Sequence, residues 1–525
     1  MNHIHVKGIS TTASPELDLL SSHLKQLSTL KFPINSGSFS RVIAAIRLSL
    51  SQTTLQKLLP LSRVDEILSL LRQFFLLGRG EFAIALISEA DEKIRSRWRR
   101  SDNLGHEKRD GFGNIVVKEG EVSAILARTW AAMGSQQGQH EDEDEDEQLE
   151  MARDLVQLII TKANVTPTKS SLNSSQTIPS IVSTPFRNLL LSVPVALTLQ
   201  IPSPLDLFLS PVDVQIYSSI NAYLLSIHRA HLRLTDLWKI TSLRRDHPAP
   251  PAAPYGSSSH GRSKTITLRE RTKARSEAMR SVWATSSAAV FFLGETEAYL
   301  QGEVVQGTWV SFQTWLVGES TSQALSSEAK KEDEVEDEVE DIWLQAGKKT
   351  PPVAGVMTTH DPQTLADAHR RYLDALASNL LLTASSFTDP LYHLLQQIDH
   401  LVALVHRIHS IWQSLDLESD EGVVDAFSDF HKEEKDVKEQ LVVIASRVKG
   451  AIEELVKSLR DIDQDKAGWD SGFEELVLSD EGLYVPAKVG RVDRLLMKLD
   501  FGGWFDGKSR NDDDYGNFSD DGADE

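Results

Sequence analysis

Apolar side chains recur every three or four residues along most of the chain, which is the spacing of an amphipathic helix. The stretch from Val212 to Lys239 places its apolar residues along one stripe, and it predicts a helix about 42 Å long. A rod of that length must lie against other helices. A second stripe runs towards Gly78, where its helix should stop before another begins at Glu81. Further helices are expected at 277–316, 424–463 and 488–500.

Two dipeptides mark the expected starts of two more helices. Asp361-Pro362 and Asp389-Pro390 each place a side chain that can cap a helix N-terminus directly before a proline. Proline suits the first helical position because its absent N–H would have no partner there. The sequences that follow carry apolar residues at helical spacing, so we expect the two helices to pack as an antiparallel pair.

One run has the character of a β-strand. Residues Leu191 to Ile201 are rich in Val and Leu, but Pro194 interrupts them, and proline cannot donate to a strand ladder. We therefore expect at most an edge strand or an extended segment here, with no sheet around it.

Segments rich in Pro, Ser, Thr and Asn, or in acidic residues, interrupt the helical pattern. They lack the apolar side chains that would offset the entropy lost on ordering. We expect long disordered loops near 134–186, 242–265 and 318–358, and an acidic disordered tail at 506–525. The predicted fold class is mainly α, an elongated helical bundle with long disordered loop insertions.

The net charge of -21 is concentrated in three short segments. Residues 141–150, 332–341 and 512–525 hold 23 acidic residues and no lysine or arginine, which leaves the remainder of the chain near +2. The acidity therefore describes solvated segments, and the folded body is close to neutral. We expect no nucleic-acid partner for a chain of this overall sign.

The absence of cysteine and of long apolar runs excludes several classes of protein. Without Cys there is no disulfide framework, thiol nucleophile or Cys-ligated metal site, which favours a reducing compartment such as the cytosol or nucleus. The N-terminal sequence has no basic segment followed by an apolar one, and no run approaches about 18 apolar residues. We therefore expect neither secretion nor membrane insertion.

One segment satisfies a phosphate-binding motif. Gly502 to Ser509 fits the pattern G-x-x-x-x-G-K-[ST], whose backbone N–H groups curl around phosphates between a buried strand and a helix. The sequence upstream instead predicts an amphipathic helix, and Asp512 to Asp514 downstream would repel a nucleotide. A helix end with a glycine stop is the favoured interpretation, and a nucleotide hydrolase that uses Lys508 is the alternative.

Two pairs of histidines, His228/His231 and His406/His409, stand three residues apart on expected helices. At this spacing both rings can face one way, as in some metal sites. Neither pair lies in an H-E-x-x-H pattern or has a carboxylate at a supporting spacing, so structural histidines are favoured over a zinc site. We predict no catalytic, cofactor-binding or metal-binding residues.

A cluster of basic residues opens the helix that is expected after the loop at 242–265. Glutamates are mixed in with the basic residues, so a solvated helix face is the simpler interpretation. The functional interpretation is a patch that binds an acidic protein. Nucleic acid is a less suitable partner, because no aromatic side chains alternate with the charges as they do in many nucleic-acid sites. The candidate protein-binding residues are Arg269, Arg271, Lys273, Arg275 and Arg280.

Six segments follow the order of motifs in a known family and together cover about residues 61–505. The first is Leu70-Leu-Arg-Gln-Phe-Phe-Leu-Leu-Gly-Arg-Gly-Glu-Phe82. The others are Leu191–Leu199, Tyr217–Trp238, Phe291–Trp315, Asp361–Leu373 and Leu495–Phe501. In this order they resemble the gamma-tubulin complex component family, and the Gly-Arg-Gly form of the first segment is most like component 4.

The resemblance implies that residues 61–505 are a helical C-terminal domain that binds gamma-tubulin within a gamma-tubulin ring complex. Members of the family are non-enzymatic scaffolds for microtubule nucleation at cytoplasmic microtubule-organising centres and spindle poles, and they bind no cofactor of their own. The implied partners are gamma-tubulin and other gamma-tubulin complex components. Residues 1–60 are similar to the family's linking helices, so we expect most of the family's N-terminal domain to be absent.

A helical subunit of a different scaffold, such as a vesicle-tethering complex unrelated to tubulin, is the alternative function. Such a subunit would show the same helices and loops, but it would have no affinity for gamma-tubulin.

Overall fold

The chain divides into two compact units. One comprises residues 1–67, 201–209 and 316–369, and the other comprises residues 68–200, 210–315 and 370–525. The computed structural model describes residues 15–30, 36–50, 59–102, 117–137, 143–161, 185–240, 259–317, 362–421, 429–469, 484–486 and 492–501.

Helices account for nearly all of the described residues, which confirms the prediction of a mainly α fold. The loop expected at 318–358 and the tail expected at 506–525 lie outside the described residues, as does the motif from Gly502 to Ser509.

The first unit contains two short helices near the start of the chain. Helix α1 (Pro15–Ser28) packs against α2 (Ser36–Leu50), and most of α4 (Leu61–Leu70) belongs to the same unit. The unit also holds the short turn η4 (Leu205–Leu207) and the first half of α13 (Pro362–Asn379). The rings of Phe208 and His369 lie 4.9 Å apart there, and both side chains are buried.

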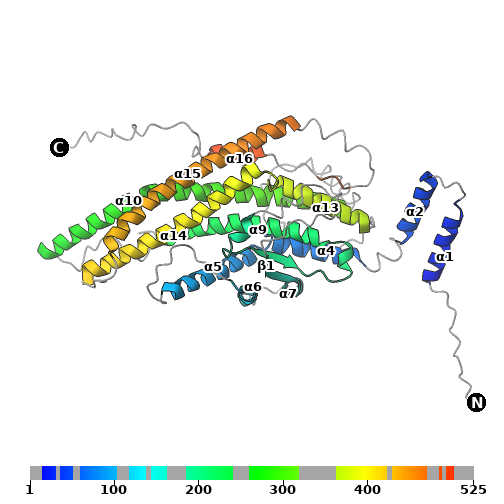
Figure 1. Ribbon diagram of the computed structural model, residues 1–525, viewed down its shortest axis with the longest axis horizontal. Coiled ribbons are helices and arrows are strands. Elements are labelled where there is room, and N and C mark those ends of the chain that lie inside the picture. Colours follow the sequence, from blue (N-terminus) through cyan, green and yellow to red (C-terminus); the bar gives the residue numbers. More distant parts are fainter. Residues whose placement is uncertain are drawn as a thin grey trace, which may run out of the picture. The chain divides into compact units, whose positions relative to one another are not determined.

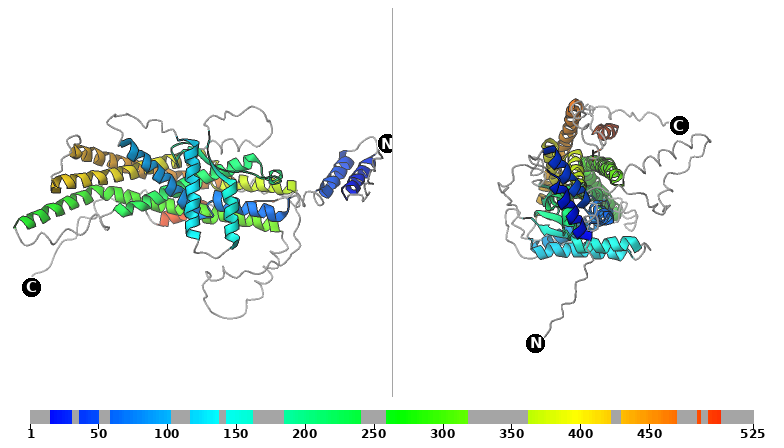
Figure 2. Two further views of the ribbon diagram at one scale, coloured as in Figure 1. Left: turned by 90° about the horizontal axis from the view of Figure 1, so that it is seen from below. Right: turned by 90° about the vertical axis from the view of Figure 1, so that its right-hand side faces the viewer.

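The second unit is a bundle of long helices. Helices α9 (Pro211–Asp236), α10 (Ser259–Ala298), α14 (Ser385–Glu421) and α15 (Phe430–Trp469) run side by side in Figures 1 and 2. Helix α9 packs against α10 and α14, and α16 (Val492–Phe501) packs against α10 and α15. This is the arrangement that the apolar stripes require, because each helix buries its stripe against a neighbour.

Shorter elements complete the second unit. Helix α5 (Gly80–Asp102) packs against α6 (Glu119–Gln137) and α9. Helices α6 and α7 (Glu143–Leu155) run across the direction of the long helices in Figure 2. The prediction of a loop near 134–186 was therefore wrong for the residues of α7.

A two-stranded antiparallel sheet was not expected from the sequence. Strand β1 (Val156–Ile160) pairs with β2 (Val195–Leu199), and Val156 lies opposite Leu199. Pro194 immediately precedes β2, where its carbonyl accepts a hydrogen bond from Thr161 N at 2.8 Å. Pro194 lies just outside the paired residues, so its missing N–H removes no hydrogen bond between the two strands. The expected edge strand is confirmed as β2. The expectation that no sheet surrounds it was wrong, because β1, too short to recognise by its pattern, supplies the partner strand.

The chain turns sharply between α4 and α5. Helix α4 continues as a π-helical turn, η2 (Leu71–Phe75), and ends before Gly78, as predicted. Gly78 N donates to Arg72 O at 3.1 Å, and a Cβ on Gly78 would lie only 2.9 Å from that oxygen. A larger side chain would therefore clash with the backbone at this turn. The wider π turn leaves carbonyls without a helical partner, and Asn221 Nδ2 of α9 donates to Phe74 O at 3.2 Å and Phe75 O at 3.1 Å.

The helix expected at 277–316 begins earlier than predicted. Helix α10 starts at Ser259 and continues through the π-helical turn η6 (Tyr299–Val305) into α11 (Gln306–Val317). The end of the loop expected at 242–265 is therefore helical. Threonine hydroxyls here donate to carbonyls four residues back, as Thr265 does to Gly261 O at 2.9 Å, so their polar groups are satisfied within the helix.

Helix α14 also begins before its predicted start. It starts at Ser385, so Pro390 lies inside the helix and Asp389 does not cap it. Pro390 cannot donate to Ser386 O four residues back. That carbonyl instead accepts a hydrogen bond from Ser458 Oγ of α15 at 2.8 Å. The neighbouring helix thus replaces the bond that proline removes, whereas α13 does begin at Pro362 as expected.

Candidate protein-binding site

Helix α9 lies at the centre of the second unit and carries more buried polar residues than any other described helix. Ser210 caps it: Ser210 Oγ accepts from Asp213 N at 3.3 Å, and Asp213 Oδ2 accepts from Ser210 N at 2.8 Å. This reciprocal pair satisfies two backbone donors that a helix start leaves free. Most α9 residues are buried, so the polar side chains of α9 must find partners inside the protein.

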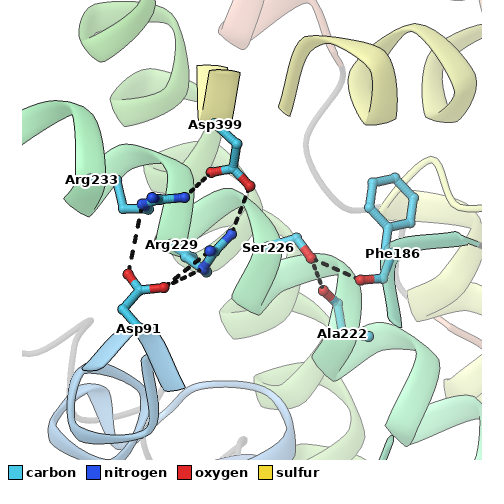
Figure 3. A network of polar contacts seen from close by, with 7 residues as sticks. All are labelled: Asp91, Phe186, Ala222, Ser226, Arg229, Arg233 and Asp399. Atoms are coloured by element: carbon cyan, nitrogen blue, oxygen red, sulfur yellow. Dashed lines mark hydrogen bonds and ion pairs between the residues drawn. The ribbon is translucent and has the colours of Figure 1, made fainter. Parts of the chain in front are cut away.

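A charged cluster joins α9 to α5 and α14 (Figure 3). Arg229 donates to Asp91 Oδ1 at 3.1 and 3.0 Å and to Asp399 Oδ2 at 2.9 Å. Arg233, one turn further along α9, binds Asp399 and lies 3.7 Å from Asp91. Burial alone would lower the pKa of Arg229, but the charges and hydrogen bonds of Asp399 and Asp91 raise it. These two cations and two anions thus form a neutral cluster across three helices. We call Asp91, Arg229, Arg233 and Asp399 the Arg229 clamp.

Ser226, one turn before Arg229, borders a small cavity beside this clamp. Its Oγ donates to Ala222 O at 2.6 Å and lies 3.3 Å from Phe186 O (Figure 3). The cavity has a volume of about 20 Å³, and Arg187 Nε in its wall has no hydrogen-bond partner. One water molecule would fill this space. The cavity is too small for a substrate or cofactor.

His228 and His231 share one carboxylate, which the sequence spacing did not reveal. Glu297 of α10 accepts from His228 Nδ1 at 2.5 Å and from His231 Nδ1 at 2.9 Å. Burial would raise the pKa of Glu297, but these hydrogen bonds and the histidine charges lower it to about 2. The pair therefore ties α9 to α10. Across the described part of the chain, no three His, Cys, Asp or Glu side chains form a metal-binding group.

We expect Glu297→Gln to lower stability at neutral pH and to make little difference in strong acid. Because the pKa of Glu297 falls from 4.5 to about 2 on folding, its carboxylate stabilises the fold above pH 4.5, and this contribution is lost as pH falls towards 2. The linkage is worth about 3 kcal/mol at most. Denaturant unfolding across this pH range measures the difference between wild type and variant.

The control for this experiment is Glu295→Gln. Glu295 pairs with Lys498 at 3.8 Å on the surface, so its loss should cost less than about 1 kcal/mol. A wild-type advantage over Glu297→Gln that stays constant down to pH 2 would contradict the assigned role of the carboxylate.

Two of the five predicted site residues, Arg271 and Arg275, form ion pairs with another residue of the same chain. Arg271 Nη1 donates to Asp416 Oδ1 at 2.8 Å, and Arg275 donates to both Asp416 oxygens at 2.8 Å. Burial would raise the pKa of Asp416, but the hydrogen bonds and charges of Arg275 and Arg271 lower it. The Arg275 guanidinium also lies 5.3 Å from the ring centroid of Trp412, whose Nε1 donates to Glu434 of α15 at 2.7 Å. Arg271 and Arg275 therefore fasten α10 to α14.

The other three predicted residues lie on the opposite face of α10. Arg269, Lys273 and Arg280 are exposed, and at 100° per residue they fall within about 40° of one another around the helix. Arg262 is exposed on the same face and was missed, because the loop was expected to extend past it. We call Arg262, Arg269, Lys273 and Arg280 the α10 basic stripe.

The α10 basic stripe has few internal partners. Lys273 lies 4.0 Å from Glu277, and this pair is exposed. Arg262, Arg269 and Arg280 form no ion pair with any described residue. Exposed Ile266 lies between the first two stripe residues. An exposed row of cations with an apolar side chain among them suits a contact with an acidic protein.

Residues 65–505 match the sequence model of a family described as the gamma-tubulin complex component C-terminal region. No curated protein matches the chain. Within the described ranges, no helix is both long and apolar enough to cross a membrane.

Proposed function

Because the chain belongs to the gamma-tubulin complex component C-terminal family, we propose that it binds gamma-tubulin as a subunit of a gamma-tubulin complex and so supports microtubule nucleation. Its partners are then gamma-tubulin and other gamma-tubulin complex components, at cytoplasmic microtubule-organising centres and spindle poles. The Gly-Arg-Gly sequence at Gly78 to Gly80 supports component 4 as the most similar member. Residues 61–505 are the proposed binding domain, preceded by linking helices at 1–60.

The proposed role is positional and requires no catalysis by this chain. The Arg229 clamp joins α5, α9 and α14, and the Asp416 pairs join α10 to α14. Charged pairs with fixed hydrogen-bond geometry hold helices in one arrangement. A bundle fastened in this way can present gamma-tubulin at a fixed position and angle, so that neighbouring copies together template a microtubule end.

The α10 basic stripe is the proposed contact with gamma-tubulin, and its exposure is the observation that supports this choice. A tubulin is expected to present an acidic surface, and opposite charges accelerate and orient association. Of the five residues predicted from the sequence, Arg269, Lys273 and Arg280 remain candidates for direct contact. Arg271 and Arg275 would act by holding α10 in place, since both bind Asp416.

We expect the triple variant Arg269→Glu, Lys273→Glu and Arg280→Glu to bind gamma-tubulin at least about tenfold more weakly at low salt, with a smaller loss at high salt. Three exposed charges are reversed, and salt screens such contacts. Binding of purified gamma-tubulin to the recombinant chain, measured by titration and co-sedimentation at both salt concentrations, checks the prediction.

The matched control reverses three exposed lysines of α15, Lys432, Lys449 and Lys457, which changes the net charge by the same amount. Equal losses in both triple variants would mean that only the overall charge matters, and unchanged affinity in the first would remove the stripe from the contact. Failure of the wild-type chain to bind gamma-tubulin would favour the alternative of an unrelated helical scaffold.

A further inference from the structure

Helix α16 packs against α10 and points towards the α10 basic stripe. Arg494 of α16 pairs with Glu303 of η6 at 3.4 Å, and Lys498, one turn later, pairs with Glu295 of α10 at 3.8 Å. Higher residue numbers in α16 thus face lower residue numbers in the rod of α10 and η6, so α16 runs antiparallel to that rod. The end of α16 at Phe501 is therefore directed towards the first half of α10, which carries the stripe.

The contact with α16 and the α10 basic stripe lie on the same side of α10. At 100° per residue, Glu295 falls only about 60° from Arg280 around the helix. Along the helix axis, at 1.5 Å per residue, Glu295 is about 22 Å from Arg280 and about 50 Å from Arg262. Arg280 is therefore the member of the stripe nearest to α16, and Arg262 is the furthest.

The residues that follow α16 carry charge that complements the stripe. Residues 512–525 hold seven acidic residues and no lysine or arginine, and they lie outside the described residues. Their acids form two groups, 512–514 and 520–525, with Tyr515 and Phe518 between the groups. The stripe has the matching pattern, because exposed Ile266 lies between cations. Opposite charges and apolar side chains can therefore meet in one contact.

The chain is long enough to bring both acidic groups onto the stripe. Asp512 is 11 residues beyond Phe501, and 11 extended residues span at most about 40 Å, which exceeds the distance to Arg280. Asp520 is 19 residues beyond Phe501, and its reach of at most about 68 Å exceeds the distance to Arg262.

The acidic residues at 332–341 are less well placed for this contact. They follow α11, which ends at Val317, and Val317 is roughly 55 Å from Arg280 along the rod at 1.5 Å per residue. The 15 residues from Val317 to Glu332, fully extended, span at most about 54 Å. The start of this segment therefore barely reaches the nearest cation, which favours residues 512–525 as the occupant.

We propose that residues 512–525 bind the α10 basic stripe of the same chain and compete there with gamma-tubulin. The first acidic group pairs with the cations nearest α16, and the second pairs with those nearest the start of α10. Single exposed ion pairs are weak, but a segment of the same chain is present at the stripe at a high local concentration. Salt should release the contact, because it screens exposed charges.

The competition rests on the proposed function, because gamma-tubulin is the proposed partner of the stripe. The contact within the chain is testable without gamma-tubulin. The chain has no cysteine, so two introduced cysteines can carry spin labels at chosen positions. Ser276→Cys places one label on α10 at an exposed site about 40° around the helix from Arg280. Ser519→Cys places the other between the two acidic groups.

The first measurement is the distance between the two labels in the free chain, by pulsed electron paramagnetic resonance. We expect shorter distances at low salt than at high salt. Changing the seven acids of 512–525 to Asn or Gln should abolish this difference, and changing seven of the eight acids at 332–341 is the matched control, which should preserve it. If neutralising 512–525 leaves the distances unchanged, or if both changes act equally, the inference is overturned.

The second measurement is the affinity of the unlabelled chain for purified gamma-tubulin at low salt. The variant neutralised at 512–525 should bind at least about fivefold more tightly than wild type, and the variant neutralised at 332–341 should stay within about twofold. Adding Arg269→Glu, Lys273→Glu and Arg280→Glu to the first variant should remove its gain, because the segment and gamma-tubulin then no longer share a site.

The outcomes separate this inference from the proposed function. If the label distances respond as expected but the two neutralised variants bind gamma-tubulin equally, the competition is overturned and the proposed function stands. If neither wild type nor the variants bind gamma-tubulin, the proposed function and the competition are both overturned. The label distances then still decide whether residues 512–525 bind the stripe.

Discussion

Replacing Arg229 by methionine is expected to lower the free energy of unfolding by about 3–5 kcal/mol. Arg229 is only 6% exposed, and its guanidinium holds the carboxylates of Asp91 and Asp399. Methionine is similar in length but cannot donate hydrogen bonds. Two partly buried aspartates would then face each other with only Arg233 between them, and like charges in a poorly solvated site repel strongly.

Denaturant unfolding, followed by circular dichroism, measures this loss. Arg407→Met is the matched control, because Arg407 and Glu433 form an exposed pair at 3.6 Å that should contribute less than about 1 kcal/mol. If both variants lost the same small amount of stability, the clamp would be no more than a surface ion pair. The variant Asp91→Leu, Asp399→Leu, Arg229→Met, Arg233→Met should recover part of the loss, since it leaves no unpaired charge of the cluster behind.

Replacing Asn221 by leucine is expected to lower stability by about 2–6 kcal/mol, because each buried acceptor left without a donor costs about 1–3 kcal/mol. The Asn221 amide donates to the carbonyls of Phe74 and Phe75 in the π-helical turn. Leucine has the same number of side-chain heavy atoms with the same branching, so the result reports on hydrogen bonding more than on a change of shape.

The π-helical turn at Phe74 and Phe75 should be the first structure affected by Asn221→Leu. Hydrogen exchange should therefore quicken locally, between Leu71 and Gly78, before the rest of the bundle responds. Gln157→Leu, which removes an exposed side-chain hydrogen bond to Gln200 at 3.2 Å, is the control and should change stability by less than about 0.5 kcal/mol. Unchanged exchange in the turn would show that the amide is dispensable.

The sequence allowed the positions of the long helices to be predicted, because apolar spacing directly reflects which face is buried. The stripe from Val212 to Lys239 corresponds to α9 and its terminal turn, and the stop near Gly78 is confirmed. Helix starts were less predictable. Asp389-Pro390 has the form of a capped start, but the carbonyl that proline leaves free is satisfied by Ser458, and this allows α14 to begin at Ser385.

The contacts that define the candidate site could not be predicted, because they join residues far apart in the sequence. Nothing near Arg229 indicates Asp91 or Asp399, and nothing near His228 indicates Glu297. The sequence did contain one signal, the angular positions of the five basic residues around a single helix. Helical geometry alone separates Arg269, Lys273 and Arg280 from Arg271 and Arg275 on opposite sides of one helix, and it would have divided the exposed cations from those that bind Asp416.

The placement of charge in this bundle means that the proposed contact with a partner and the internal stability of the bundle should respond differently to dissolved ions. The Arg229 clamp is internally neutral and largely shielded from water, so dissolved ions reach it poorly. The exposed cations of α10 meet those ions fully. A rise in ionic strength should therefore weaken the proposed contact between these cations and an acidic partner, whereas phosphorylation of that partner should strengthen it. In both cases the helices joined by the Arg229 clamp should keep their arrangement.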